Sequence, residues 1–189
     1  MYTYKRTIKS GDMIEVEYYQ SIRKIGKNYG GRKSNNSLSS AKMRKANKLR
    51  AVKHMQRLIN ANFGSGDFFC RFSAPYGTYE SEKKFRAEVG KWLDRINYRL
   101  KKQGKGRLKY IAFIECGKSG KNWHIHIIVS KEDRELLSEQ WPYENGQNFT
   151  PLYKNENFKK LAEYITKDLT GKEDVDAAQK RMMTSRNLK

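Results

Sequence analysis

The chain has 189 residues, of which 40 are Lys or Arg and 20 are Asp or Glu, so its formal net charge is +20. This length is enough for one domain with its own hydrophobic core, so folding needs neither disulfides nor a structural metal. No apolar run approaches the ~20 residues of a membrane-spanning helix, and the first ten residues lack the apolar segment of a secretory signal. The two cysteines exclude a disulfide-rich secreted fold and favour a cytoplasmic location.

The positive charge is concentrated in one part of the chain. Residues 18–66 contain no Asp or Glu. Because a run of cations repels itself at low salt and phosphate groups relieve that repulsion, we expect a nucleic acid partner and salt-dependent binding. A basic face that is only solvated is the alternative. The basic residues of this segment are Arg23, Lys24, Lys27, Arg32, Lys33, Lys42, Arg44, Lys45, Lys48, Arg50, Lys53 and Arg57.

The first part of the chain predicts two strands around a basic helix. Residues 13–19 alternate apolar and polar side chains, which is typical of a strand. Residues 21–40 are rich in Gly, Asn and Ser and are expected to form a loop or a mobile arm. Residues 40–62 have helical periodicity, and the short aromatic segment 67–73 predicts a second strand.

The second part predicts a helix, a hairpin and a last helix. Apolar side chains at spacings of three and four predict a helix over residues 80–102. The apolar segments 108–116 and 123–130 are joined by the turn-rich sequence GKSGKN, which indicates an antiparallel hairpin. A helix is expected over residues 157–169, and a charged, partly mobile tail over residues 171–189.

This order of elements favours an α+β fold with a central, mainly antiparallel sheet flanked by helices. We expect a single domain overall. In it, residues 1–62 form a basic extension that is packed on, or continuous with, a core formed by residues 63–189.

Two histidines, His124 and His126, lie two residues apart in the second strand of the predicted hairpin. Alternate residues of a strand share a face, so the two imidazoles are expected side by side. Buried ring nitrogens need hydrogen-bond partners, and such a pair fits two ligands of one divalent cation. The alternative is a hairpin whose histidines only hydrogen-bond each other and water at a sheet edge.

Glu115 is expected to complete this metal site. If residues 117–122 form the turn, Glu115 lies opposite His124, on the imidazole face. An ionised carboxylate in so apolar a strand is costly unless it is paired or binds a metal. Two imidazoles and one carboxylate leave coordination positions open, and they suit Mn²⁺ or Mg²⁺ as a Lewis acid on a phosphate oxygen. A register slip of one residue would move Glu115 to the other face.

Tyr164 and Lys167 lie three residues apart in the last predicted helix, so they are neighbours on its surface. A phenol with its usual pKa of about 10 is a poor nucleophile at neutral pH. A nearby ammonium group and a metal-polarised phosphate would both assist it. Considered alone, the two residues also fit a half-buried tyrosine beside a solvated lysine.

Glu115, the glycine-rich turn, His124-Ile125-His126 and the downstream Tyr164-x-x-Lys167 together resemble the HUH endonuclease superfamily. Within it, the chain is similar to the single-tyrosine replication initiators of rolling-circle plasmids and phages. Residues 58–63 and 66–69 resemble that family's entry into its first core strand, and residues 185–189 resemble its closing segment. The resemblance spans roughly residues 45–189.

The resemblance implies a five-stranded antiparallel sheet with flanking helices and a metal on its central strands. It implies that Glu115, His124 and His126 hold the metal. Tyr164 would be the nucleophile, and Lys167 would help to place the phosphate or the metal. Such an enzyme nicks and rejoins single-stranded DNA through a 5′-phosphotyrosine intermediate, and so initiates rolling-circle replication in a bacterial or phage-infected cell. The implied partners are single-stranded or hairpin origin DNA, with a host polymerase or helicase besides.

One residue departs from the family's pattern. The first motif of the family is usually a strand rich in Leu or Phe and Thr, whereas this chain has Arg71 there. We expect Arg71 to contact DNA. Further DNA contacts are expected from four basic residues of the helix and the hairpin turn, namely Arg44, Lys45, Lys48 and Lys121.

Two other functions stay open. Single-tyrosine transposases share this order of motifs, whereas relaxases generally have their tyrosine ahead of the histidine pair. A non-catalytic nucleic-acid-binding protein would need the positive charge, but not the carboxylate, the two histidines and the tyrosine together.

Overall fold

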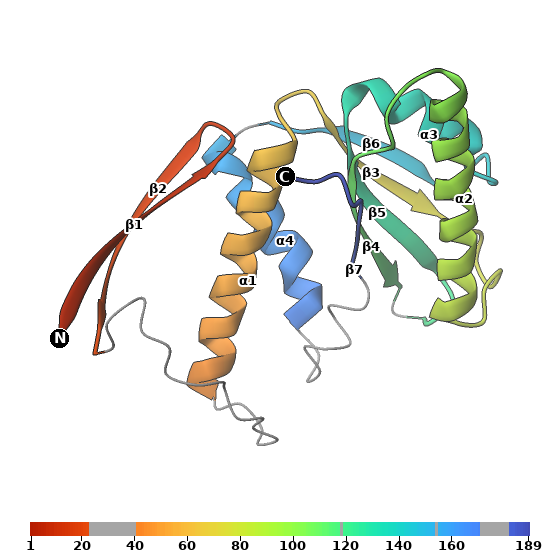
Figure 1. The fold of residues 1–189 in the computed structure, drawn as a ribbon. Coiled ribbons are helices and arrows are strands. Elements are labelled where there is room, and N and C mark those ends of the chain that lie inside the picture. Colours follow the sequence, from red (N-terminus) through yellow and green to blue (C-terminus); the bar gives the residue numbers. More distant parts are fainter. Residues whose placement is uncertain (23–40, 118, 154, 171–181) are drawn as a thin grey trace, which may run out of the picture.

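The computed structural model describes residues 1–22, 41–117, 119–153, 155–170 and 182–189. A central five-stranded sheet, in the order β6-β3-β5-β4-β7, lies between two layers of helices (Figure 1). All of its pairings are antiparallel, so the expected α+β fold is confirmed. Its strands are β3 (Phe68–Ser73), β4 (Tyr110–Cys116), β5 (Trp123–Val129), β6 (Gln147–Pro151) and β7 (Met182–Thr184).

One face of the sheet is covered by α2 (Glu82–Lys102) together with α3 (Arg134–Gln140). The side chain of Ser81 caps the start of α2 by accepting a hydrogen bond from the backbone N–H of Lys84. The predicted apolar stripe of α2 is buried and packs against alternate residues of β3 and β5, among them Phe72 and Ile125. This layer forms the larger part of the core.

The other face is covered by α1 (Ala41–Asn62) and α4 (Lys159–Thr170), as Figure 1 shows. Met55 and Ile59 of α1 are buried against the sheet residues Ile111, Phe113 and Ile128. Ala162 and Ile165 of α4 belong to the same cluster. Both predicted helices are therefore confirmed, and the second half of α1 is part of the core.

A separate ribbon of two strands, β1 (Tyr2–Ser10) and β2 (Met13–Ser21), lies beside α1 (Figure 1). Only β2 follows from the sequence pattern, because β1 is polar and has little alternation. Glu15 and Glu17 of β2 form ion pairs with Arg57, and Glu17 also pairs with Lys53. The basic run is thus not wholly unopposed, since the ribbon brings acids against its C-terminal part.

The structure corrects the expected elements at the C-terminal end and adds two more. Residues 182–189 are not a mobile tail, because β7 forms the edge of the sheet beside β4 and the N–H of Ser185 donates to Tyr110 O. Neither α3 nor β6 was predicted. Two short 3₁₀ helices, η1 (Lys131–Asp133) and η2 (Asn155–Phe158), precede α3 and α4. Residues 23–40 of the expected loop lie outside the described residues.

Within the parts of the chain described above, no helix combines the length and the apolarity that crossing a membrane requires.

Candidate active site

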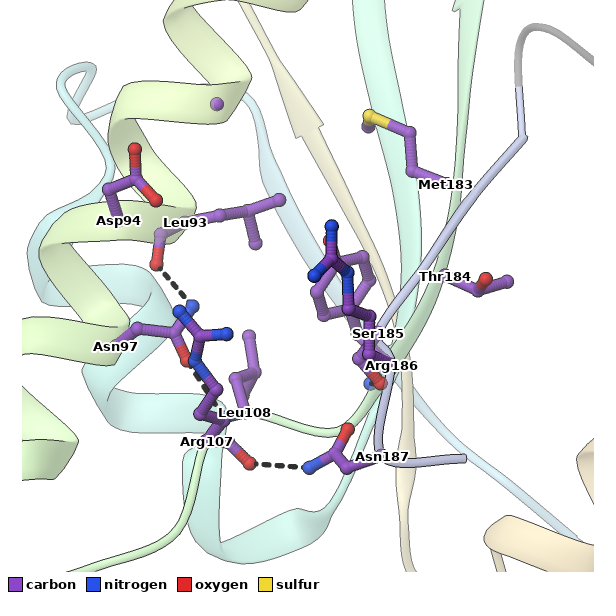
Figure 2. A pocket seen from close by; sticks show the side chains of 12 residues that line it. Leu93, Asp94, Asn97, Arg107, Leu108, Met183, Thr184, Ser185, Arg186 and Asn187 are labelled. Atoms are coloured by element: carbon purple, nitrogen blue, oxygen red, sulfur yellow. Dashed lines mark hydrogen bonds between the residues drawn. The ribbon is translucent and has the colours of Figure 1, made fainter. Parts of the chain in front are cut away.

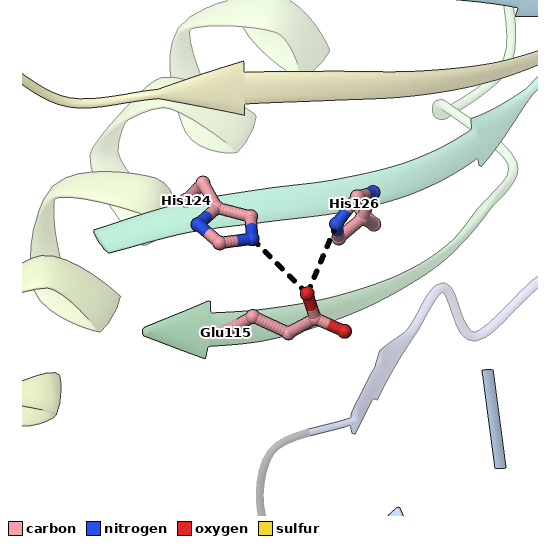
Figure 3. Close-up of side chains that lie close together, drawn as sticks. All are labelled: Glu115, His124 and His126. Atoms are coloured by element: carbon pink, nitrogen blue, oxygen red, sulfur yellow. Dashed lines mark hydrogen bonds and ion pairs between the residues drawn. The ribbon is translucent and has the colours of Figure 1, made fainter. Parts of the chain in front are cut away.

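A carboxylate and two imidazoles converge on the face of the sheet that carries α1 and α4. Oε2 of Glu115 lies 3.0 Å from Nε2 of His124 and 3.1 Å from Nε2 of His126 (Figure 3). One ligand atom from each residue lies within 4.8 Å of the other two. The predicted juxtaposition of these three residues is therefore confirmed as geometry.

The β4–β5 hairpin builds this cluster. Its register pairs Glu115 with His124, as the turn length predicts, and Phe113 with His126. The turn is closed by a hydrogen bond from the N–H of Gly117 to Asn122 O. Gly120 has a φ of +72°, a left-handed conformation that glycine adopts without strain.

Each imidazole is held in place by its surroundings. The Nδ1 of His124 lies 3.2 Å from Asn122 O, which leaves Nε2 directed at Glu115. The ring of His126 is stacked between Phe69 and Phe113, with ring centroids 5.1 Å and 4.9 Å away. Such outer contacts fix the orientation of metal-binding histidines in proteins.

The donor set fits a divalent cation. His124 and His126 are 7% and 5% exposed, so each imidazole is almost entirely surrounded by protein, while Glu115 is only partly buried. Two imidazole nitrogens and a carboxylate oxygen suit ions such as Mn²⁺, and three protein ligands leave positions for a substrate. The group would be held by Glu115 from β4 and by the two histidines from β5.

Tyr164 lies beside the cluster. Its ring is edge-on to those of His126 and Phe69, with ring centroids 6.0 Å apart in both cases. The side chain is 44% exposed, so a ligand from solvent can reach it. The tyrosine that the sequence singles out thus belongs to the same surface as the three candidate metal ligands.

The position of Tyr164 depends on how the start of α4 is attached to α1. The buried side chain of Asn60 donates a hydrogen bond to Asn157 O over 2.7 Å, and Gln56 donates to the same oxygen over 3.1 Å. Phe158 follows with a positive φ and is buried in the core below α1. These contacts fix where α4 begins, and hence where its second turn carries Tyr164.

Lys167 lies in α4, one helical turn after Tyr164. Its side chain is outside the described part of the structure, so the expected assistance to the phosphate or the metal stays a prediction.

Arg71 is the nearest basic neighbour in the sheet register. It lies directly opposite His126 on β3 and opposite Asn148 on β6. Cross-strand partners share a face, so Arg71 is on the side of the histidines. Its Nε is buried and makes no hydrogen bond within the described residues. Asn148 was missed by the sequence analysis because its strand was not predicted.

The other four candidate DNA-binding residues lie apart from the cluster. Arg44, Lys45 and Lys48 are exposed on the first half of α1, before the part that packs on the sheet. Lys121 is exposed in the hairpin turn, where its carbonyl accepts a hydrogen bond from Gly77 N–H. None of these placements tests a contact with DNA.

A hollow of about 740 Å³ lies on the opposite face of the sheet, between α2 and the C-terminal segment (Figure 2). Hydrogen bonds hold its wall together: Asn97 Oδ1 accepts from Leu108 N–H, and Asn187 Nδ2 donates to Arg107 O. It contains none of the candidate metal ligands and is separated from them by the sheet.

Comparison with known proteins adds a family. The family of the ORF2-type replication-associated proteins matches residues 77–173, just over half of the chain. The match includes Glu115, the histidine pair, Tyr164 and Lys167. It ends short of Arg71, α1 and the ribbon. No curated protein and no solved structure matches the chain. The chain therefore belongs to this family of replication-associated proteins.

Proposed function

We propose that this protein is a metal-dependent endonuclease that nicks and rejoins single-stranded DNA to initiate rolling-circle replication. One observation carries the proposal: the ring of Tyr164 lies edge-on to that of His126, whose Nε2 belongs to the Glu115–His124–His126 cluster. A nucleophile and a phosphate-activating centre must be close together for the reaction to be intramolecular in the complex. Membership of a replication-associated family supports the biological role.

Glu115, His124 and His126 would hold Mn²⁺ or Mg²⁺. When bound, such an ion supplies Lewis-acid polarisation of the phosphate oxygens and helps to orient the phosphate. The hydrogen bond of His124 Nδ1 and the stacking of His126 keep both Nε2 atoms directed at one point. The two imidazoles therefore need little rearrangement to act as ligands.

Tyr164 would act as the nucleophile. Its hydroxyl loses its proton and attacks the phosphorus, a Tyr164 Oη–P bond forms, and the P–O3′ bond breaks. The upstream strand leaves with a free 3′-OH that a polymerase can extend, and the downstream 5′-phosphate stays on the tyrosine. Attack by a 3′-OH on this phosphotyrosine reverses the exchange and rejoins a strand. Lys167 would assist by its positive charge.

Arg71 would bind the substrate phosphate from the β3 side of the cluster. A guanidinium offers several N–H donors to phosphate oxygens, and the Nε of Arg71 has no partner within the part of the chain that the structure covers. In this arrangement, the phosphate lies between Arg71, the Glu115–His124–His126 cluster and Tyr164.

The test is formation of a covalent adduct. The full chain is incubated with Mn²⁺ and end-labelled single-stranded oligonucleotides that tile the replicon encoding it, and the products are separated on a denaturing gel. We expect a protein–DNA adduct that Tyr164→Phe abolishes. Tyr153→Phe is the matched control, since Tyr153 is also exposed and lies shortly before α4. If no oligonucleotide gives an adduct although the chain binds the DNA, the non-catalytic alternative is correct.

A further inference from the structure

A second hollow, of about 530 Å³, lies between the ribbon and α1, outside the residues that match the family. The cationic side chains Arg6 and Lys53 and the rings of Tyr18 and Tyr19 line it, together with Glu17. The ribbon and the Glu115 cluster lie on opposite sides of α1 (Figure 1). The hollow is therefore not part of the candidate active site.

Four tyrosines gather at the end of the ribbon that carries this hollow. Tyr4 and Tyr19 are cross-strand partners with stacked rings, whose centroids are 5.7 Å apart, and Tyr2 continues the row at 6.3 Å from Tyr4. Tyr2, Tyr18 and Tyr19 are 48%, 69% and 40% exposed. None of the four belongs to either core cluster, so core packing does not explain them.

The charges around these rings are arranged for an anion. Glu17 is the acid that lines the hollow, and it accepts hydrogen bonds from Lys53 and Arg6, which lower its pKa to about 2. The two cations are each 54% exposed and have N–H groups left for another acceptor. Lys5, opposite Tyr18 on the ribbon, adds a further exposed cation.

We propose that this tyrosine surface, formed by Tyr2, Tyr4, Tyr18, Tyr19, Lys5, Arg6 and Lys53, binds single-stranded DNA. Unpaired bases would stack on the tyrosine rings while the cations contact the phosphates. Proteins that hold single strands combine exposed aromatic rings with a basic groove in this way. In a duplex the bases already stack on one another, so a row of ring faces favours the unpaired strand. The proposal rests on the proposed function only for the identity of the ligand.

The surface would hold the substrate strand away from the site of cleavage. A strand held at both places gains affinity because the second contact is intramolecular. The ribbon would then serve to keep the nicked strand on the protein while the 3′ end is extended.

Binding is measured without cleavage. Fluorescence anisotropy of labelled oligo(dT)₁₅ is followed with the full chain in EDTA. We expect the double variant Tyr2→Ser/Tyr19→Ser to bind at least about tenfold more weakly, since one stacked base is worth roughly 1–3 kcal/mol, about 5- to 150-fold. Tyr2→Phe/Tyr19→Phe keeps the rings and should bind within about twofold of the unchanged protein.

The matched control is Tyr98→Ser. Tyr98 is 59% exposed on α2 and also lies near a cation, with Lys102 Nζ 4.8 Å from its ring, but it borders no such hollow. It should leave the affinity unchanged. Unaltered oligo(dT) binding by the Ser double variant, or an equal loss with Tyr98→Ser, would overturn the proposal. So would tighter binding of a 15-bp mixed-sequence duplex that is lost with the same two tyrosines. Failure of adduct formation with the unchanged protein concerns only the proposed function, because the anisotropy experiment involves no cleavage.

Discussion

The ring of Tyr164, on α4, meets the ring of His126, on β5, at an interplanar angle of 80° with 6.0 Å between the ring centroids. The ring of Phe69 contacts both: it stacks on His126 and receives the edge of Tyr164. A helix packed across the sheet thus carries its phenol to the strand that carries the imidazoles. The arrangement depends on the hydrogen bonds that attach the start of α4 to Asn60 and Gln56 of α1.

Removing the two imidazoles is expected to abolish metal binding. In His124→Ala/His126→Ala, only the carboxylate of Glu115 remains of the three clustered donors, so Mn²⁺ affinity should fall by at least about 100-fold. Electron paramagnetic resonance titration of free Mn²⁺ measures this. The unchanged protein should also gain about 2.7 kcal/mol in unfolding free energy at a metal concentration 100 times the Kd.

The control for this pair is His54→Ala, because His54 is exposed on α1 and outside the cluster. It should bind Mn²⁺ like the unchanged protein. Equal Mn²⁺ affinity in the double variant would show that the histidines are only structural.

Arg71→Ala is expected to raise the KM for a cleavable oligonucleotide or lower kcat, by about tenfold to 100-fold overall. This is the effect of losing one hydrogen bond to a charged group, worth about 1.5–3 kcal/mol. Arg71→Lys should restore part of the activity because it keeps the charge but not the planar donors. Arg99→Ala, an exposed arginine of α2, is the control. If Arg71→Ala instead changes Mn²⁺ affinity and leaves cleavage by the metal-saturated enzyme intact, Arg71 acts on the cluster and not on DNA.

Lys45→Gln/Lys48→Gln is expected to flatten the salt dependence of DNA binding. Each lost phosphate contact reduces the slope of log K against log salt by about 0.7–0.9, so the pair should lower it by about 1.4–1.8. Cleavage of a short single strand should be unaffected, because both side chains are exposed and lie on the first half of α1. Titrations of a hairpin oligonucleotide at several salt concentrations measure the slope. An equal reduction by Lys83→Gln/Lys101→Gln, on α2, would argue for a general charge effect.

Gly11→Ala is expected to displace the ribbon from α1. Gly11 has a φ of +59°, and a Cβ there would lie 2.1 Å from Asn60 O, a backbone atom that cannot move alone. Gly66→Ala is matched to it, since Gly66 also has a positive φ but open space around its Cα. The control should lose only about 1–2 kcal/mol of backbone strain. Urea denaturation and limited proteolysis of residues 1–22 distinguish the two; equal losses would mean that the close approach is unimportant.

Alkylation should distinguish the two cysteines. Burial raises the pKa of the Cys70 thiol to about 12, so almost none of it is thiolate at pH 8, where iodoacetamide reacts with the ionised form. Cys116 is only partly buried, at the end of β4. Mass spectrometry of the folded protein should find Cys116 labelled and Cys70 unlabelled, and both labelled in urea. Rapid labelling of Cys70 without urea would contradict the burial of this strand against α2.

The sequence alone determines the local parts of the candidate site. A short turn between two apolar strands allows one register, and this register puts Glu115 opposite His124. The period of two along β5 then places His126 on the same face. The long helices follow from apolar spacing for the same reason: each pattern is written in neighbouring residues. We also propose that residues 1–62 and the core form one folding unit, since Met55 and Ile59 are buried in it.

Only the tertiary structure decides which distant elements meet. The edge strands β6 and β7 are short and largely polar, so their sequences carry no clear strand pattern, and they become strands by pairing with β3 and β4. The approach of Tyr164 to His126, and of Arg71 to the same imidazole, arises from packing and pairing between segments far apart in the chain. Local periodicity indicates which face an element buries, but the partner for that face is selected by the shape and hydrogen bonds of the assembled core.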